Sequence, residues 1–167
     1  MLAALPAGLP PTPDPGIPWP VTASLAVLGL CLAISVYTDL RWRLILDVVT
    51  APALLLELLL LGQAGGKEQL YSSLAGMAAL FLPLFLSSLP KRPLIGEGDA
   101  KLMAVVGAAA GWPSALLVLF WVSVAGGVQA AAALAWARVR RQEKPEYVPY
   151  GVAIAAGTVL AWTVGWP

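Results

Sequence analysis

AKLMAVVGAAAGWPSALLVLFWVSVAGGVQAAAALAWA, residues 100–137, is an apolar run of 38 residues that contains one charged side chain, Lys101. As a single helix it would extend about 57 Å at 1.5 Å per residue, whereas a bilayer core is about 30 Å thick. The run must therefore turn back. Gly111-Trp112-Pro113 is the natural break, because proline removes a backbone donor and disfavours helix at the preceding residue. This stretch predicts a short membrane span followed by a longer one.

The rest of the chain has the composition of a membrane protein. Of its 167 residues 59% are hydrophobic and 11% are charged, whereas soluble domains carry about 25% charged residues. Residues 21–38, 44–61, 70–89 and 148–166 form four more apolar runs, each near the length that crosses a bilayer. We predict an all-α, polytopic bundle of six transmembrane helices over residues 21–167. Residues 1–20, with seven prolines and no Lys or Arg, are expected to form a non-helical tail.

The distribution of basic residues predicts the orientation of this bundle, because cytoplasmic loops carry an excess of Lys and Arg. With six spans and both termini on the extracytoplasmic side, only Lys67 of the ten basic residues lies outside. The nine on the cytoplasmic side are Arg41, Arg43, Lys91, Arg92, Lys101, Arg138, Arg140, Arg141 and Lys144.

The residue inventory excludes several kinds of chemistry. The chain has no histidine and a single cysteine, Cys31, so a Ser-His dyad, a zinc protease motif and a cysteine cluster are all absent. No basic stripe interleaved with aromatic residues points to nucleic acid. Catalysis would have to use carboxylates, lysines, hydroxyls or the backbone, and neither a metal nor a cofactor is implied.

Two acidic residues, Asp39 and Asp99, are the strongest candidates for a site. Asp39 ends the first predicted span and Asp99 begins the fourth, and between them the chain crosses the membrane twice. Both carboxyl groups should therefore reach the same cytoplasmic boundary. Acidic groups at membrane helices are costly and are often functional. Each also has a structural interpretation. Asp39 could pair with Arg43, and Asp99 could be an acid at the N-terminus of a helix, where the helix dipole stabilises a negative charge.

Three further acids and one lysine have simpler interpretations. Glu97 is expected to be solvated, and Asp47 to cap the second helix. Glu57, in an apolar run, should face the bundle interior and find a partner that the sequence does not identify. Lys101 could act on Asp99, bind substrate or extend to the interface.

The segment GEGDAKL, residues 96–102, resembles the G-x-G-D-x-K-L motif of the type IV prepilin peptidases, which are GxGD intramembrane aspartyl proteases. DLRWRLILD, residues 39–47, is similar to the Asp-containing segment of that family, although its Ile45-Leu46-Asp47 lacks the usual proline. VPYGVAIAAG, residues 148–157, is similar to its Pro-Tyr-Gly motif in the last helix. The four-cysteine zinc insert of longer members is not present, which indicates the short form of the family.

The resemblance implies that Asp39 and Asp99 are the catalytic pair and that Gly96 and Gly98 shape the loop that presents Asp99. Lys101 and the motif formed by Pro149, Tyr150 and Gly151 would bind substrate or shape the site. The substrates would be type IV prepilin or pseudopilin precursors, cleaved behind a short basic leader by a multi-pass protein of the inner membrane. No metal or cofactor is needed, because two adjacent carboxyls that share one proton provide both an acid and a base.

Three alternatives remain open at this point. A small transporter would also place acids among membrane helices, but it predicts acids near mid-bilayer and internal repeats. A catalytically inactive scaffold of a secretion system has no evident need for both acids. A Ser-Lys dyad of Ser87 or Ser88 with Lys91 is conceivable.

Overall fold

The computed structural model describes residues 18–88, 96–140 and 149–165. These residues form helices and their connections, and no strand occurs among them, so the predicted all-α class is confirmed. The expected tail lies almost entirely outside the described residues, and Trp19 and Pro20 already belong to the first helix. In order along the chain, the helices are α1 (Trp19–Trp42), α2 (Asp47–Ser88), α3 (Glu97–Ala110), α4 (Ser114–Arg140) and α5 (Tyr150–Val164).

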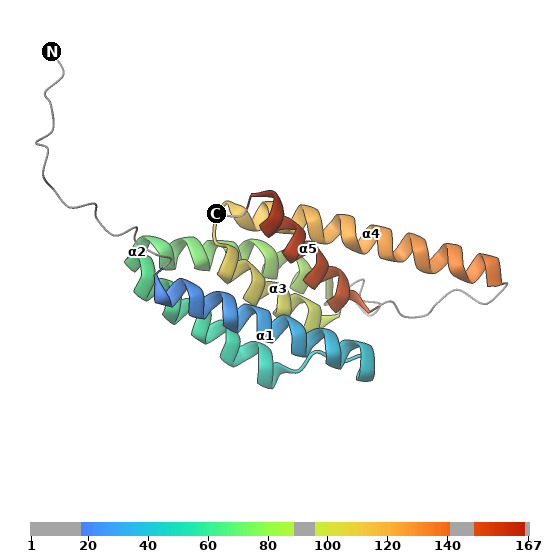
Figure 1. Ribbon diagram of the computed structural model, residues 1–167, viewed down its shortest axis with the longest axis horizontal. Coiled ribbons are helices and arrows are strands. Elements are labelled where there is room, and N and C mark those ends of the chain that lie inside the picture. The colour runs from blue at the N-terminus through green and yellow to red at the C-terminus, as the bar shows by residue number, and fades with distance from the viewer. Residues whose placement is uncertain (1–17, 89–95, 141–148, 166–167) are drawn as a thin grey trace, which may run out of the picture.

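The long helix α2 is a hairpin of two arms. Gly66 has φ 64° and ψ −148°, a backbone conformation that interrupts the helix and that glycine adopts without a Cβ penalty. The chain reverses there, and the two arms run back along each other at one end of the molecule (Figure 1). Residues 47–65 and 67–88 would extend about 29 and 33 Å, close to the thickness of a bilayer core.

Three helices, α1, α2 and α4, are long and apolar enough to cross a membrane. The other two are shorter: α3 has 14 residues and α5 has 15, which corresponds to about 21 and 22 Å. The predicted break at residues 111–113, within the apolar run 100–137, is confirmed, since α3 ends at Ala110 and α4 begins at Ser114.

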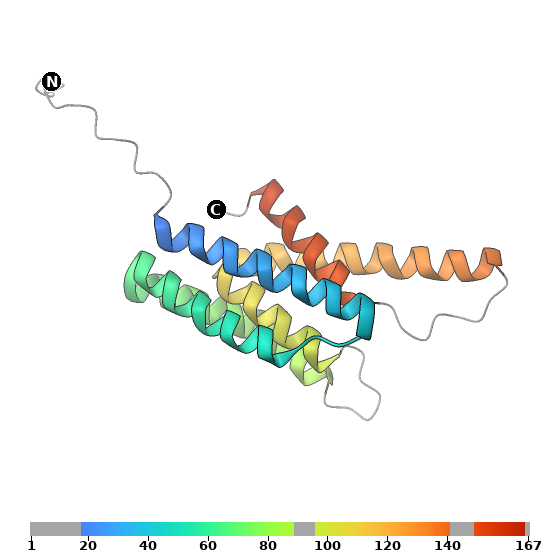
Figure 2. The ribbon, with the colours of Figure 1, turned by 60° about the horizontal axis from the view of Figure 1, so that its bottom comes forward.

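One predicted boundary was wrong. The second helix begins at Asp47 and not at Leu44, because α1 continues to Trp42 and is ended by Arg43 in a left-handed conformation, φ 56°. Residues 43–46 form an extended link that runs back along the bundle before α2 begins (Figure 2).

Helix α3 lies at the centre of the bundle, next to α1 and both arms of α2 (Figures 1 and 2). Leu102, Met103 and Val106 are fully buried. The closest approach joins α3 to the second arm of α2, where a Cβ placed on Gly107 would lie 2.5 Å from the Gly76 carbonyl oxygen. The glycine at position 107 thus allows α3 to pack closely against the second arm of α2.

The short central helix has a cavity at each end. One, of about 540 Å³, lies where α3 begins, and another, of about 470 Å³, lies where it ends, near Ala110 and the α2 turn. The first cavity is at the end of the bundle where α1 finishes.

Candidate active site

The cavity at the start of α3 is built from three segments that are distant in sequence. The end of α1 contributes Asp39, the link 43–46 and the first residue of α2 form one wall, and residues 96–101 form the other. The predicted convergence of Asp39 and Asp99 at one end of the bundle is therefore observed: both line this cavity, although 60 residues separate them.

Asp39 is held from the far end of the chain. It is 1% exposed, and its Oδ2 accepts a hydrogen bond of 2.8 Å from the backbone N–H of Gly151 at the start of α5. Gly151 is required there by space, because a Cβ on this residue would lie 2.8 Å from the same oxygen. The last helix therefore fixes the carboxyl group carried by the first.

Asp99 lies in the first turn of α3, three residues after the N-cap Gly96. Its carboxyl group accepts a hydrogen bond from the Gly96 backbone N–H, which is half of a capping box. Its Oδ1 is buried and has no hydrogen-bond partner among the described residues. Asp99 thus acts as the helix-terminal acid of the structural interpretation, and it also lines the cavity.

The two carboxyl groups are close enough to interact electrostatically, and the charge of Asp39 acts on Asp99. Both side chains are buried, at 1% and 8% exposure, so solvent screens this repulsion poorly. Two like charges in such a site repel each other more strongly than they would in water.

The glycines of the loop are needed for close packing. A Cβ on Gly98 would lie 2.9 Å from the Cβ of Ile45, so this glycine allows the 43–46 link to lie against α3. A Cβ on Gly96 would lie 3.0 Å from Asp99 Oδ2. Both glycines therefore fix the backbone around Asp99.

The predicted Pro-Tyr-Gly motif joins α5 to two other helices. The Pro149 carbonyl accepts a hydrogen bond of 2.9 Å from Gln129 Nε2 of α4. The half-buried Tyr150 ring packs on Gly126, where a Cβ would lie 2.7 Å from the ring, and its hydroxyl is within electrostatic range of Asp99. None of the three residues lines the cavity. Gly151 is linked to it by its hydrogen bond to Asp39, which does line the cavity.

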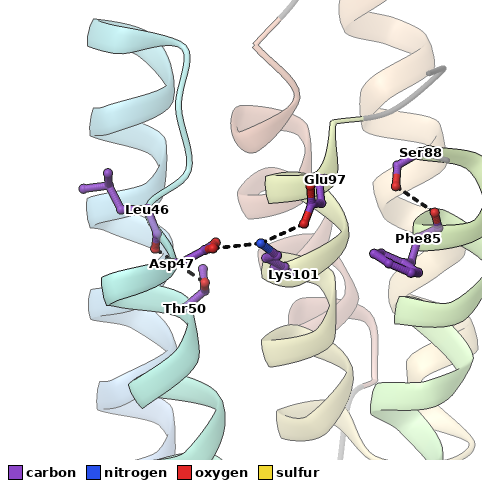
Figure 3. Close-up of polar contacts among 7 residues, drawn as sticks. All are labelled: Leu46, Asp47, Thr50, Phe85, Ser88, Glu97 and Lys101. Atoms are coloured by element: carbon purple, nitrogen blue, oxygen red, sulfur yellow. Dashed lines mark hydrogen bonds and ion pairs between the residues drawn. The ribbon is translucent and has the colours of Figure 1, made fainter. Parts of the chain in front are cut away.

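Lys101 lies between two carboxylates at the rim of the cavity (Figure 3). Its Nζ is 2.8 Å from Asp47 Oδ2 and 3.0 Å from Glu97 Oε1. Asp47 was predicted to cap α2, but it is the first residue inside that helix and its carboxylate accepts from Lys101 instead. Glu97 is exposed, as predicted, although it belongs to the first turn of α3.

The model of the type IV leader peptidase family matches residues 26–131, which is more than half of the chain and includes both Asp39 and Asp99. The chain belongs to the type IV leader peptidase family.

Relatives within the type IV leader peptidase family cover most of this chain. This chain is 32% identical to the prepilin leader peptidase/N-methyltransferase of Dickeya chrysanthemi over 156 residues, which cover 85% of this chain and 54% of that protein. The protein of the same name from Bacillus subtilis is 34% identical over 95 residues, 57% of this chain and 37% of that protein. The chain spans about half the length of most curated relatives it matches. No solved structure matches it.

Glu57 of this leader peptidase family member faces the bundle interior, as predicted. It is fully buried in the first arm of α2, and Ser24 of α1 donates its hydroxyl proton to Oε2. The other oxygen, Oε1, has no hydrogen-bond partner among the described residues. Glu57 does not line the Asp39–Asp99 cavity.

The serines of the alternative Ser-Lys dyad donate to their own helix: Ser87 to the Leu84 carbonyl and Ser88 to the Phe85 carbonyl, each at 2.7 Å. Figure 3 shows the second of these hydrogen bonds. Lys91 lies outside the described residues.

Sequence reasoning missed two residues of α4 that support the site in this family member, Gly126 and Gln129. Gln129 is a lone amide in an apolar run and Gly126 begins a Gly-Gly pair, so both carried a weak signal. Neither could be linked to the Pro-Tyr-Gly motif without knowing how α4 and α5 pack.

Proposed function

We propose that this protein is a membrane-embedded aspartyl endopeptidase that removes the leader from type IV prepilin or pseudopilin precursors. The observation that carries the proposal is the pair of buried carboxyls, Asp39 and Asp99, brought from distant helices to one cavity. Membership of the type IV leader peptidase family and the printed names of the relatives support the reaction and the substrate class.

The chemistry uses the pair as a unit. The ionised carboxylate takes a proton from a water molecule, and the water oxygen attacks the carbonyl carbon of the scissile peptide bond. The protonated carboxyl stabilises the oxyanion and then gives its proton to the leaving nitrogen, so that the C–N bond breaks into a carboxylate and an amine. The two acids titrate together, so the roles belong to the pair.

Gly151 and Gly96 are positioning residues in this proposal. Each backbone N–H fixes one carboxyl, which holds the two groups in a constant relation as substrate enters. Lys101 pairs with Asp47 and Glu97 at the rim, but its single charge offsets only one of theirs. Four carboxyl groups and two basic side chains, Arg43 and Lys101, line the cavity, so its lining carries an excess of negative charge. A basic leader would be attracted to this charge.

We further propose six membrane spans, with α2 contributing two, and both termini on the extracytoplasmic side of the inner membrane. The positions of the described basic residues support this orientation. Arg41, Arg43, Lys101, Arg138 and Arg140 belong to the ends of α1 and α4 and the start of α3, whereas Lys67 follows the α2 turn at the opposite end (Figures 1 and 2). The cavity would then face the cytoplasm.

The test of the activity is cleavage of a leader-bearing pilin precursor by the purified protein in detergent, followed by gel mobility and mass spectrometry. Asp39→Asn and Asp99→Asn should each abolish cleavage. Glu68→Gln is the matched control, because this carboxylate is exposed on the second arm of α2 and does not line the cavity, and it should retain activity. Cleavage by either of the first two variants would refute the dyad, and a transporter or an inactive scaffold would give no cleavage by the wild type.

The orientation is tested by labelling intact cells with a membrane-impermeant maleimide, in a Cys31→Ala background. Lys67→Cys should be labelled from outside, whereas Arg140→Cys should be labelled only after the inner membrane is permeabilised. The reverse pattern would refute the proposed orientation.

A further inference from the structure

A second hollow adjoins the candidate active site. It is a groove of about 370 Å³ between the two arms of α2 and helix α3, a volume typical of ligand pockets. Its wall is almost entirely apolar, formed by Ala51, Leu54, Met77, Phe81 and Ala104.

The groove and the catalytic cavity share two residues, Asp47 and Lys101. These two side chains form the 2.8 Å ion pair, so this pair is part of the boundary between a charged compartment and an apolar one. From Asp47 the groove follows α2 to Leu54, a distance of about 10 Å along the helix axis. A chain that passes the ion pair would therefore have one part among carboxylates and the next part among apolar side chains.

We propose that this groove binds the apolar segment of the substrate that directly adjoins the scissile peptide bond, while the polar leader lies in the cavity with Asp39 and Asp99. The assignment rests on the proposed peptidase function and adds a subsite to it. Its basis is the continuity of the two hollows at Asp47 and Lys101 and the change in polarity across them. A lipid acyl chain would also suit the apolar wall, and the crosslinking test below distinguishes a lipid from the peptide.

The groove makes the site selective for a particular kind of peptide bond. Burying apolar side chains contributes about 25 cal/mol of favourable free energy per Å² of surface. A substrate with polar residues in this segment would bind without that contribution. Cleavage would be confined to bonds at a junction between a polar and an apolar segment.

The first test measures steady-state cleavage of a leader-bearing pilin precursor by the full chain in detergent. Ala51 is exposed in the groove, so Ala51→Trp should fill it without disturbing the core. We expect KM to rise by about tenfold or more, with kcat nearly unchanged. Ala132→Trp, on an exposed position of α4 that lines neither hollow, is the matched control and should behave as the wild type.

The second test places a photo-crosslinker in the groove. Phe81→p-benzoylphenylalanine, combined with Asp99→Asn to prevent turnover, should form crosslinks to the apolar residues next to the scissile bond, identified by mass spectrometry. Phe120→p-benzoylphenylalanine, at an exposed site on α4, is the control and should crosslink lipid or detergent.

The outcomes separate the two proposals. If the wild type cleaves the precursor but position 81 crosslinks only leader or lipid, or if Ala51→Trp matches Ala132→Trp, the groove assignment is refuted and the peptidase function stands. If the wild type cleaves no pilin-like precursor and no crosslink to one forms, the proposed function fails and the groove assignment fails with it.

Discussion

The hydrogen bond from Gly151 to Asp39 makes a quantitative prediction for Gly151→Ala. The added Cβ would lie 2.8 Å from Asp39 Oδ2, whereas ordinary contact begins near 3.4 Å, so the oxygen must retreat by about 0.6 Å. The N–H···O distance would then lengthen from 2.8 Å to about 3.4 Å, beyond the normal range for such a bond. A hydrogen bond to a charged group contributes about 1.5–3 kcal/mol. If most of this is lost in the transition state, cleavage should slow by about 10- to 150-fold.

The assay is single-turnover cleavage of a leader-bearing precursor, with thermal unfolding in the same detergent to show that the fold is intact. Gly29→Ala is the matched control, because no atom lies within 4 Å of the added Cβ in the middle of α1. It should cleave at the wild-type rate. A folded Gly151→Ala protein with an unchanged rate would show that the N–H of Gly151 does not position the catalytic carboxyl.

Substitutions at three further positions test the contacts between helices. Gly107→Ala forces a Cβ to within 2.5 Å of the Gly76 carbonyl oxygen and should lower the free energy of unfolding by about 1–3 kcal/mol, measured by denaturant titration in detergent; an unchanged midpoint would contradict the close contact. Glu57→Ala leaves the buried Ser24 hydroxyl without its acceptor and should destabilise the protein more than Glu57→Gln, which keeps an acceptor oxygen; the opposite order in the same titration would argue against this pairing. Lys101→Gln should leave the thermal midpoint nearly unchanged, because partly exposed ion pairs contribute little to stability, and a large drop would be unexpected.

Length and hydropathy predicted roughly where the helices lie, although not that the second helix begins at Asp47. The turn at residues 111–113 followed from the excess length of the run around it, because 38 apolar residues cannot cross a bilayer once. The common location of Asp39 and Asp99 followed from counting crossings between them. These are properties of the chain path, and they do not require knowledge of how the helices pack.

The contacts between helices could not be predicted in the same way. Lys101 pairs with Asp47 across 54 positions, and Gly151 bonds Asp39 across 112. Both depend on the rotation and depth of each helix, which are set by close contacts such as that of Gly107 on its neighbour. The other apolar runs likewise contain several serines and threonines that could pair with Glu57, and only the packing of α1 on α2 selects Ser24.

The short central helix has a consequence for the electrical insulation of the membrane. Hollows of about 540 and 470 Å³ lie at its two ends, so the densely packed barrier between them is little longer than α3 itself, about 21 Å. A membrane potential of 100 mV is worth about 2.3 kcal/mol per elementary charge. Most of this potential would fall across the short packed region between the two hollows. At one point along this barrier the backbones of Gly76 and Gly107 are in close contact. Larger residues at these positions would push the two helices apart, which should increase proton leakage across the membrane as well as disturb folding.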